Sequence, residues 1–138
     1  MTKRNNMIEK IGIIMVFAMA LLQAAYAAYA YIDPQAFAAL RGTELFTAAD
    51  SDWVKIYASR TLFVALIIWL LLANRAYTIL VWASLLGTVM PITDAWLAYQ
   101  AGAENIVIYK HLATIVYLLL LSVLLGFVVK NTKQNNTN

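Results

Sequence analysis

Four long apolar segments constrain the fold of this 138-residue chain more than any other feature. A helix needs about 20 mostly apolar residues to cross the roughly 30 Å hydrocarbon core of a bilayer. Hydrophobic residues make up 63% of the chain and charged residues only 12%, whereas a soluble domain has about 45–50% apolar and about 25% charged residues. The sequence therefore predicts an integral membrane protein.

The predicted spans are helices, because lipid offers no partner to free backbone N–H and C=O groups. The second apolar run, residues 61–73, has 13 residues and is too short to span, so this helix must begin near Val54 and include Arg60. We predict spans at about residues 9–31, 54–73, 77–97 and 106–129. The predicted fold class is all-α, a four-helix transmembrane bundle that forms a single membrane domain over residues 1–138.

A short additional helix is predicted between the first two spans, at about residues 34–41. Asp33 is a good N-cap, Pro34 is tolerated at the first helical position, and Gly42 can end the helix. We expect this helix to lie at the outer surface or to cover the bundle there. The polar residues 131–138 predict a disordered tail.

The charges predict that both termini lie inside. This orientation places six of the ten Lys and Arg residues on the inner side, as the positive-inside rule requires. We expect a multi-pass protein of a bacterial inner membrane. Ala28-Tyr29-Ala30 resembles a signal-peptide cleavage site, but the apolar segment continues through Tyr31 and is long enough to span. A retained first helix is favoured, and cleavage stays the alternative.

Three ionisable residues lie within the predicted spans: Arg60, Asp94 and His111. A charge near the centre of a membrane helix costs roughly 2.5–3.5 kcal/mol on insertion scales, so such residues usually pair, line a cavity or bind a ligand. Antiparallel threading brings all three to the outer half of the bundle, where Tyr57 also lies. We predict a polar or ligand site formed by Arg60, Asp94, His111 and Tyr57.

Arg60 has three open interpretations: a side chain that snorkels to the surface, an ion pair with Asp94, or a ligand contact. The nine Leu, Ile, Phe and Val residues of 61–73 can offset one arginine during insertion, so insertion alone does not require a partner. Asp94 shares a helix face with Pro91, which can kink the helix and open a pocket. The alternative is that Asp94 lies among the headgroups and ends the helix.

His111 shares a face with Thr114, Leu118 and Ser122, and this weakly polar stripe is expected to face the bundle interior. A neutral imidazole there can relay a proton or bind a carbonyl or quinone-like oxygen. The alternative is a hydrogen-bonded packing residue.

The composition excludes several kinds of site. The chain has no cysteine and one histidine, which excludes disulfides, thiolate sites and multi-histidine metal sites. The basic residues lie at helix ends rather than in one patch, so no nucleic-acid partner is expected. No nucleophile with an ordered base and no phosphate-binding glycine loop is recognisable, so no catalytic residue is assigned.

Three short motifs and one histidine resemble the DoxX-like superfamily of small four-helix membrane proteins, and a family of unknown function within it. They are Tyr57-Ala58-Ser59-Arg60-Thr61, the basic hairpin Asn74-Arg75, Pro91-Ile92-Thr93-Asp94-Ala95, and His111. The similarity covers roughly residues 57–126. It implies a four-helix bundle, and some members of the superfamily are subunits of quinone-linked redox systems.

The sequence favours a non-enzymatic or accessory membrane protein with a polar site at the outer end of its bundle. One alternative is a redox membrane subunit that holds a quinone, which would be its only cofactor. Another is a small-solute or proton-coupled carrier, which would require an oligomer. The expected partner is the lipid bilayer, with a second copy or another membrane subunit left open.

Overall fold

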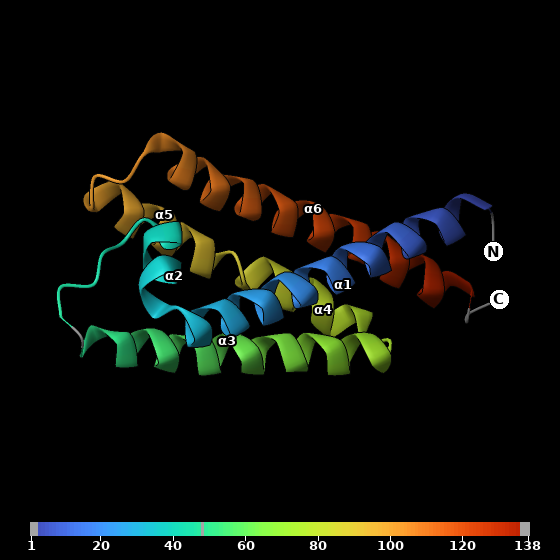
Figure 1. Cartoon of the computed structure of the whole chain (residues 1–138). Coiled ribbons are helices and arrows are strands. Elements are labelled where there is room, and N and C mark those ends of the chain that lie inside the picture. The colour runs from blue at the N-terminus through green and yellow to red at the C-terminus, as the bar shows by residue number, and fades with distance from the viewer. Residues whose placement is uncertain (1–2, 48, 136–138) are drawn as a thin grey trace.

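The computed structural model describes residues 3–47 and 49–135, which form helices and connecting turns without any strand. Figure 1 shows the six helices. They are α1 (Lys3–Ile32), α2 (Pro34–Arg41), α3 (Asp50–Ala73), α4 (Tyr77–Leu86), α5 (Val89–Gln100) and α6 (Asn105–Asn135). Four segments are long and apolar enough to span a membrane: Asn6–Ile32, Asp50–Ala73, Tyr77–Gln100 and Asn105–Thr132. The predicted four-helix bundle with a short helix between its first two spans is confirmed.

The spans run antiparallel along one long axis, with both chain ends near one end of the bundle and α2 at the other (Figure 1). We call these the terminal end and the α2 end. Helix α1 packs on α3 and α6, and α6 also packs on α4 and α5. Helix α3 makes few contacts with α4, to which a short hairpin joins it, and fewer still with α5. The bundle is therefore loosest between α3 and α5.

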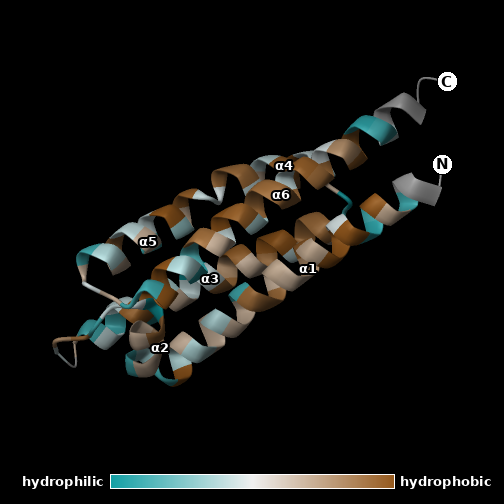
Figure 2. Ribbon diagram, turned by 90° about the horizontal axis from the view of Figure 1, so that it is seen from above, coloured by the Kyte–Doolittle hydropathy of each residue, from teal (hydrophilic) through white to brown (hydrophobic). Residues whose placement is uncertain are grey.

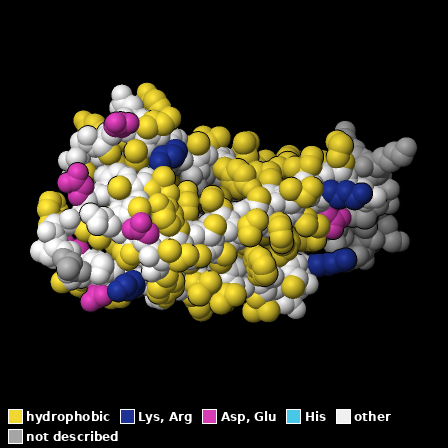
Figure 3. Space-filling view, viewed as in Figure 1, with side chains coloured by type: hydrophobic (Ala, Val, Ile, Leu, Met, Phe, Trp, Pro, Cys, Tyr) yellow, Lys and Arg dark blue, Asp and Glu magenta, His cyan; other side chains and the backbone are white. Residues whose placement is uncertain are grey.

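The surface of the bundle is apolar in the middle and charged at the ends (Figures 2 and 3). Large apolar side chains from the middle of the spans are more than half exposed, including Ile14, Leu66, Leu86 and Leu120. Such a band is costly in water and suits lipid. Most acidic side chains gather at the α2 end, where Lys and Arg side chains also lie, and the terminal end carries mainly Lys and Arg (Figure 3). The inside location of the termini stays a prediction that agrees with this polarity.

Two groups of buried side chains hold the bundle. The leucine cluster, toward the terminal end, consists of Val16, Leu80, Leu121 and Leu125. The aromatic cluster, at the α2 end, consists of Ala30, Phe37 and Ala58 with Tyr26, Val54 and Tyr57 packed against them. Both clusters join α1 to later helices, so α1 is an integral part of the packing.

The third span is disturbed near Pro91, as the sequence allowed. Helix α4 ends at Leu86 and α5 begins at Val89, while Gly87 and Thr88 between them keep right-handed helical dihedrals. Pro91 explains the disturbance, because it has no N–H to donate to the carbonyl of Gly87. The N–H of Met90 donates instead to the carbonyl oxygen of Gly87, with an N–O distance of 3.2 Å. This hydrogen bond spans three residues, so the helix is tighter here. The disturbance lies beside the loose side of the bundle.

The end of the chain also differs from its prediction. Helix α6 continues through Asn135, so residues 131–135 of the predicted disordered tail are helical. Residues 136–138 lie outside the described part of the chain.

Helix α2 has the bounds that its sequence predicted. The carboxylate of Asp33 accepts a hydrogen bond of 2.9 Å from the N–H of Ala36, and Gly42 ends the helix with a left-handed φ of 81°. The ammonium group of Lys110 donates to the carbonyl oxygen of Leu40 at 3.0 Å, a favourable position for a cation at a helix C-terminus. These contacts fix α2 across the α2 end of the bundle.

Candidate functional site: a polar cluster at the end of an apolar pocket

Three ionisable side chains from three helices meet at the α2 end. Arg41 at the end of α2 donates through Nη2 to Oδ2 of Asp94 on α5. The Nδ1 atom of His111 on α6 lies 3.9 Å from the same oxygen, too far for a hydrogen bond but close enough for an electrostatic contact. We call Arg41, Asp94 and His111 the polar cluster. With a neutral imidazole, its formal charges cancel.

The polar cluster lies well inside the helices that carry it. Asp94 is six residues before the end of α5, and His111 is six residues after the start of α6. At 1.5 Å per residue, each lies about 9 Å from its helix end. The sequence placed Asp94 within one turn of the end of its helix, and the longer α5 puts it deeper. A structural role as a simple helix end in the headgroups is therefore disfavoured.

Aromatic rings hold the guanidinium group of Arg41. Its Cζ atom is 5.6 Å from the ring centroid of Tyr26 and 6.0 Å from that of Tyr57, both within cation–π range. Phe37 packs against both tyrosines, at centroid distances of 5.9 and 5.6 Å. The aromatic cluster thus presents Arg41 to Asp94, and it explains why the site includes Tyr57, as predicted.

The predicted ion pair between Arg60 and Asp94 is wrong. Asp94 pairs with Arg41, and Arg60 on α3 is exposed and does not line the pocket described below. An exposed arginine within a span can lay its aliphatic stem along the helix and reach toward the interface. Of the four residues predicted for the site, the structure brings together Tyr57, Asp94 and His111, and it leaves Arg60 outside.

Arg41 is the residue that the sequence interpretation missed. The sequence does not single it out, because it does not show which neighbour α2 packs on. One signal was available: Arg41 follows Phe37 by four residues and therefore lies on the same helix face. Phe37 is buried at 3% exposure, so the apolar edge of α2 directs Arg41 toward the bundle.

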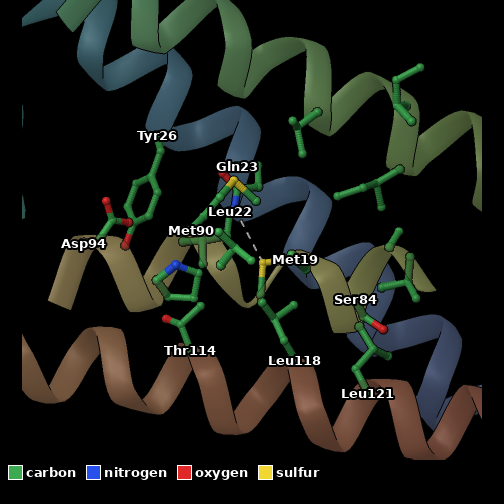
Figure 4. Close-up of a pocket in the computed structure, with 18 of the residues that line it drawn as sticks. Met19, Leu22, Gln23, Tyr26, Ser84, Met90, Asp94, Thr114, Leu118 and Leu121 are labelled. Atoms are coloured by element: carbon green, nitrogen blue, oxygen red, sulfur yellow. Dashed lines mark hydrogen bonds between the residues drawn. The ribbon is translucent and has the colours of Figure 1, made fainter. Parts of the chain in front are cut away.

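The polar cluster closes one end of a pocket of about 420 Å³. Figure 4 shows Tyr26 and Asp94 pointing toward one another at one end, with Met19, Leu118 and Leu121 lining the rest. The predicted inward stripe of α6 is part of this wall, since His111, Thr114 and Leu118 all line the pocket. Volumes of roughly 300–1,000 Å³ with a few polar groups are typical of small-molecule sites.

The pocket opens through the loose side of the bundle. Its lining includes Phe63 on α3 and Val89 and Met90 on α5, which are 63%, 62% and 47% exposed. These side chains come from the middle of their spans and belong to the apolar band that suits lipid. The mouth therefore faces the acyl chains of a surrounding bilayer.

His111 carries an unsatisfied polar atom beside this pocket. The residue is 4% exposed, and its Nε2 atom is buried without a hydrogen-bond partner. The imidazole also lies within hydrogen-bonding reach of the backbone of Arg41. Buried polar atoms are nearly always hydrogen-bonded, so an orphan needs an explanation. Gln23, which also lines the pocket, donates within its own helix to the sulfur of Met19 at 3.8 Å.

The site offers no metal centre. Among the described residues, no group of three His, Cys, Asp or Glu side chains is arranged to hold a metal ion. The chemistry available is ionic and hydrogen-bonding recognition at one end and apolar contact along the rest.

The fold and the pocket define a small multi-pass membrane protein with a polar cluster at one end of its bundle. The chain belongs to the family described as Domain of unknown function (DUF4267), whose model matches residues 12–125. That match covers the second and third spans, most of the first and fourth, and every residue of the polar cluster. No curated protein and no solved structure matches the chain. The family match does not test the resemblance to the DoxX-like superfamily, which stays a prediction.

Proposed function

We propose that this protein is a non-enzymatic membrane protein that binds a lipid-like molecule from the surrounding leaflet. The observation that carries the proposal is the pocket itself, which is apolar along its length, open toward lipid and closed at one end by an ion pair. A molecule with a polar head and an apolar chain matches both parts. The head would lie at the polar cluster, and the chain would run toward Leu80 and Leu121.

The location of the pocket supports entry from the bilayer. Its mouth lies between α3 and α5, where helix packing is weakest and the flanking side chains are exposed and apolar. A ligand could enter sideways without crossing water. In the predicted orientation, the polar cluster belongs to the outer leaflet of a bacterial inner membrane, and the protein would sample lipid of that leaflet.

Native mass spectrometry of the gently extracted protein tests this proposal. We expect the wild type to carry a lipid-sized adduct and Ala83→Trp to lose it, because Ala83 lines the pocket and an indole there would fill it. Ala28→Trp is the matched control, since Ala28 is also an exposed alanine on a span but does not line the pocket. Equal adducts on both variants would refute ligand binding at this site.

A quinone-linked redox subunit is the second candidate, and one observation favours it. The orphan Nε2 of His111 could hydrogen-bond a ring carbonyl if the imidazole proton lay on that atom. A bound quinone would supply the electron transfer, and the residues that would hold it are His111 and Arg41, not Arg60. Quinone identified in the adduct, with its absorbance lost in His111→Ala, would support this role. Adducts free of quinone would count against it.

A further inference from the structure

We propose that the molecule bound in this pocket carries an uncharged hydroxyl head, which donates a hydrogen bond to Asp94. This inference rests on the proposed lipid-binding function and names the chemical class of its ligand. It follows from which atoms of the polar cluster are left without partners, and from the charge that the cluster already has.

In the described part of the chain, the polar cluster leaves one acceptor of Asp94 and several N–H donors of Arg41 free. The Arg41 contact uses Oδ2 of Asp94, and the hydrogen bonds found among the described residues leave Oδ1 without a donor. The Asp94 side chain is 28% exposed and lines the pocket, so Oδ1 can be reached from inside it. An ionised carboxylate accepts and cannot donate. A hydroxyl group on the occupant can donate to Oδ1 and accept from a free N–H of Arg41, which also lines the pocket.

His111 adds a second acceptor. Its Nδ1 faces Oδ2 of Asp94 at 3.9 Å, and a neighbouring carboxylate favours the tautomer that keeps the proton on Nδ1. The orphan Nε2 then carries a lone pair. Because Nε2 is buried, Oδ1 of Asp94 is the acceptor that an occupant can reach, and a hydroxyl group can donate to it.

Charge excludes the commonest phospholipid heads. Arg41 and Asp94 neutralise each other, so a cationic head would leave the site with a net positive charge, and an anionic head would face the carboxylate. The aromatic faces that could bind a quaternary ammonium are already in contact with Arg41, 5.6 and 6.0 Å from its Cζ atom. An uncharged alcohol leaves the cluster neutral and supplies the missing donor.

The test uses four photoreactive probes with the same twelve-carbon chain and diazirine. Their heads are a primary alcohol, its methyl ether, an amine and a carboxylate. In the wild-type protein reconstituted in nanodiscs, we expect the alcohol to label peptides of α3 and α5 at least tenfold more efficiently than the ether, as one charge-assisted hydrogen bond predicts. The amine and the carboxylate should label no better than the ether.

A paired variant keeps the protein folded while removing the recognition. Arg41→Met with Asp94→Leu replaces the ion pair by apolar side chains of similar size, a change that is often neutral for stability. We expect it to label equally with alcohol and ether. Lys55→Met with Asp52→Leu is the control, because it removes an exposed ion pair of 3.4 Å on α3, and it should retain the alcohol preference.

The outcomes separate this inference from the proposed function. Equal labelling of the wild-type pocket by alcohol and ether, abolished by Ala83→Trp, would keep lipid binding and overturn hydroxyl recognition. A preference for the amine or the carboxylate would overturn it as well. Labelling that never maps to the pocket, for any probe, would overturn both proposals.

Discussion

The two ends of the bundle are held together by different interactions. At the terminal end, the leucine cluster joins α1, α4 and α6 through apolar packing. Neutral hydroxyl groups add hydrogen bonds there, from Tyr77 to Glu9 and from Tyr117 to the carbonyl oxygen of Met15. At the α2 end, an ion pair connects α2 to α5, and Lys110 holds the last turn of α2 through a backbone carbonyl. The pocket connects the two ends, because Val16, Leu80 and Leu121 of the leucine cluster line it and the polar cluster closes it. An ion pair between helices is what distinguishes the α2 end.

The difference between the two ends matters because lipid chains can replace the apolar contacts of leucine, but they cannot replace an ion pair. Acyl chains are as apolar as leucine, so apolar helix contacts in a membrane are stabilised by close fit and little else. A polar contact has no substitute in lipid, and it can hold helices in place while leaving space between them. The α2 end can therefore keep α3 and α5 apart without losing its structure.

Breaking the ion pair on one side should have the largest effect. Arg41→Ala leaves Asp94 as an uncompensated charge that is only 28% exposed, and we expect a loss of about 3–5 kcal/mol in the free energy of unfolding. Unfolding of the reconstituted protein by steric trapping measures this loss. Lys55→Ala is the control, since its pair with Asp52 is exposed and should be worth at most about 1 kcal/mol. Similar losses for the two variants would contradict the distinct role of the α2 end.

The leucine cluster should respond more weakly. Leu125 is 1% exposed and packs over Gly12, where an added Cβ would lie 3.2 Å from Leu125 Cδ2. Leu125→Ala should cost about 2 kcal/mol, the low end for a buried leucine, because the transfer from water is missing in a membrane. Leu120→Ala, on the 56% exposed lipid face, should cost much less. Probe labelling should be unchanged in both variants.

Substitutions at two glycines can test how α2 packs against the start of α6. Gly42 and Gly102 both have a positive φ, 81° and 69°, so alanine is strained at either position. An added Cβ at Gly42 would lie 2.7 Å from Val107 Cγ1, whereas at Gly102 it meets nothing within 4 Å. We expect Gly42→Ala to cost about 1–2 kcal/mol more than Gly102→Ala. Equal losses would show that the packing of α2 on the start of α6 adds nothing.

The sequence predicted the fold well, because each part of it depends on local patterns. Span lengths follow from hydropathy, and Asp33, Pro34 and Gly42 define α2 by capping rules. The disturbance at Gly87–Thr88 was only partly predictable: Pro91 signals a disturbed helix, but whether it kinks or splits depends on neighbouring helices.

The site was only partly predictable, because depth along a helix is encoded locally and rotation about its axis is not. Asp94 and His111 were assigned to one cluster by their depth, and the structure brings them together. Arg60 has a suitable depth but lies on an exposed face of α3. Arg41 reaches the cluster through the packing of Phe37, a tertiary contact that no period in the sequence encodes.

Substitution of Arg60 should have the smallest effect of these predictions. It also tests most directly whether rotation about the helix axis, and not depth, decides which residue belongs to the site. Its side chain is exposed and lies outside the pocket, so Arg60→Gln should change the free energy of unfolding by no more than about 0.5 kcal/mol. It should also leave the alcohol preference of the probes intact, whereas Arg41→Gln should reduce it, because only Arg41 contacts Asp94. Unfolding and probe labelling of the two glutamine variants, measured side by side, decide between the two arginines. If only Arg60→Gln lost the alcohol preference, Arg60 and not Arg41 would belong to the site.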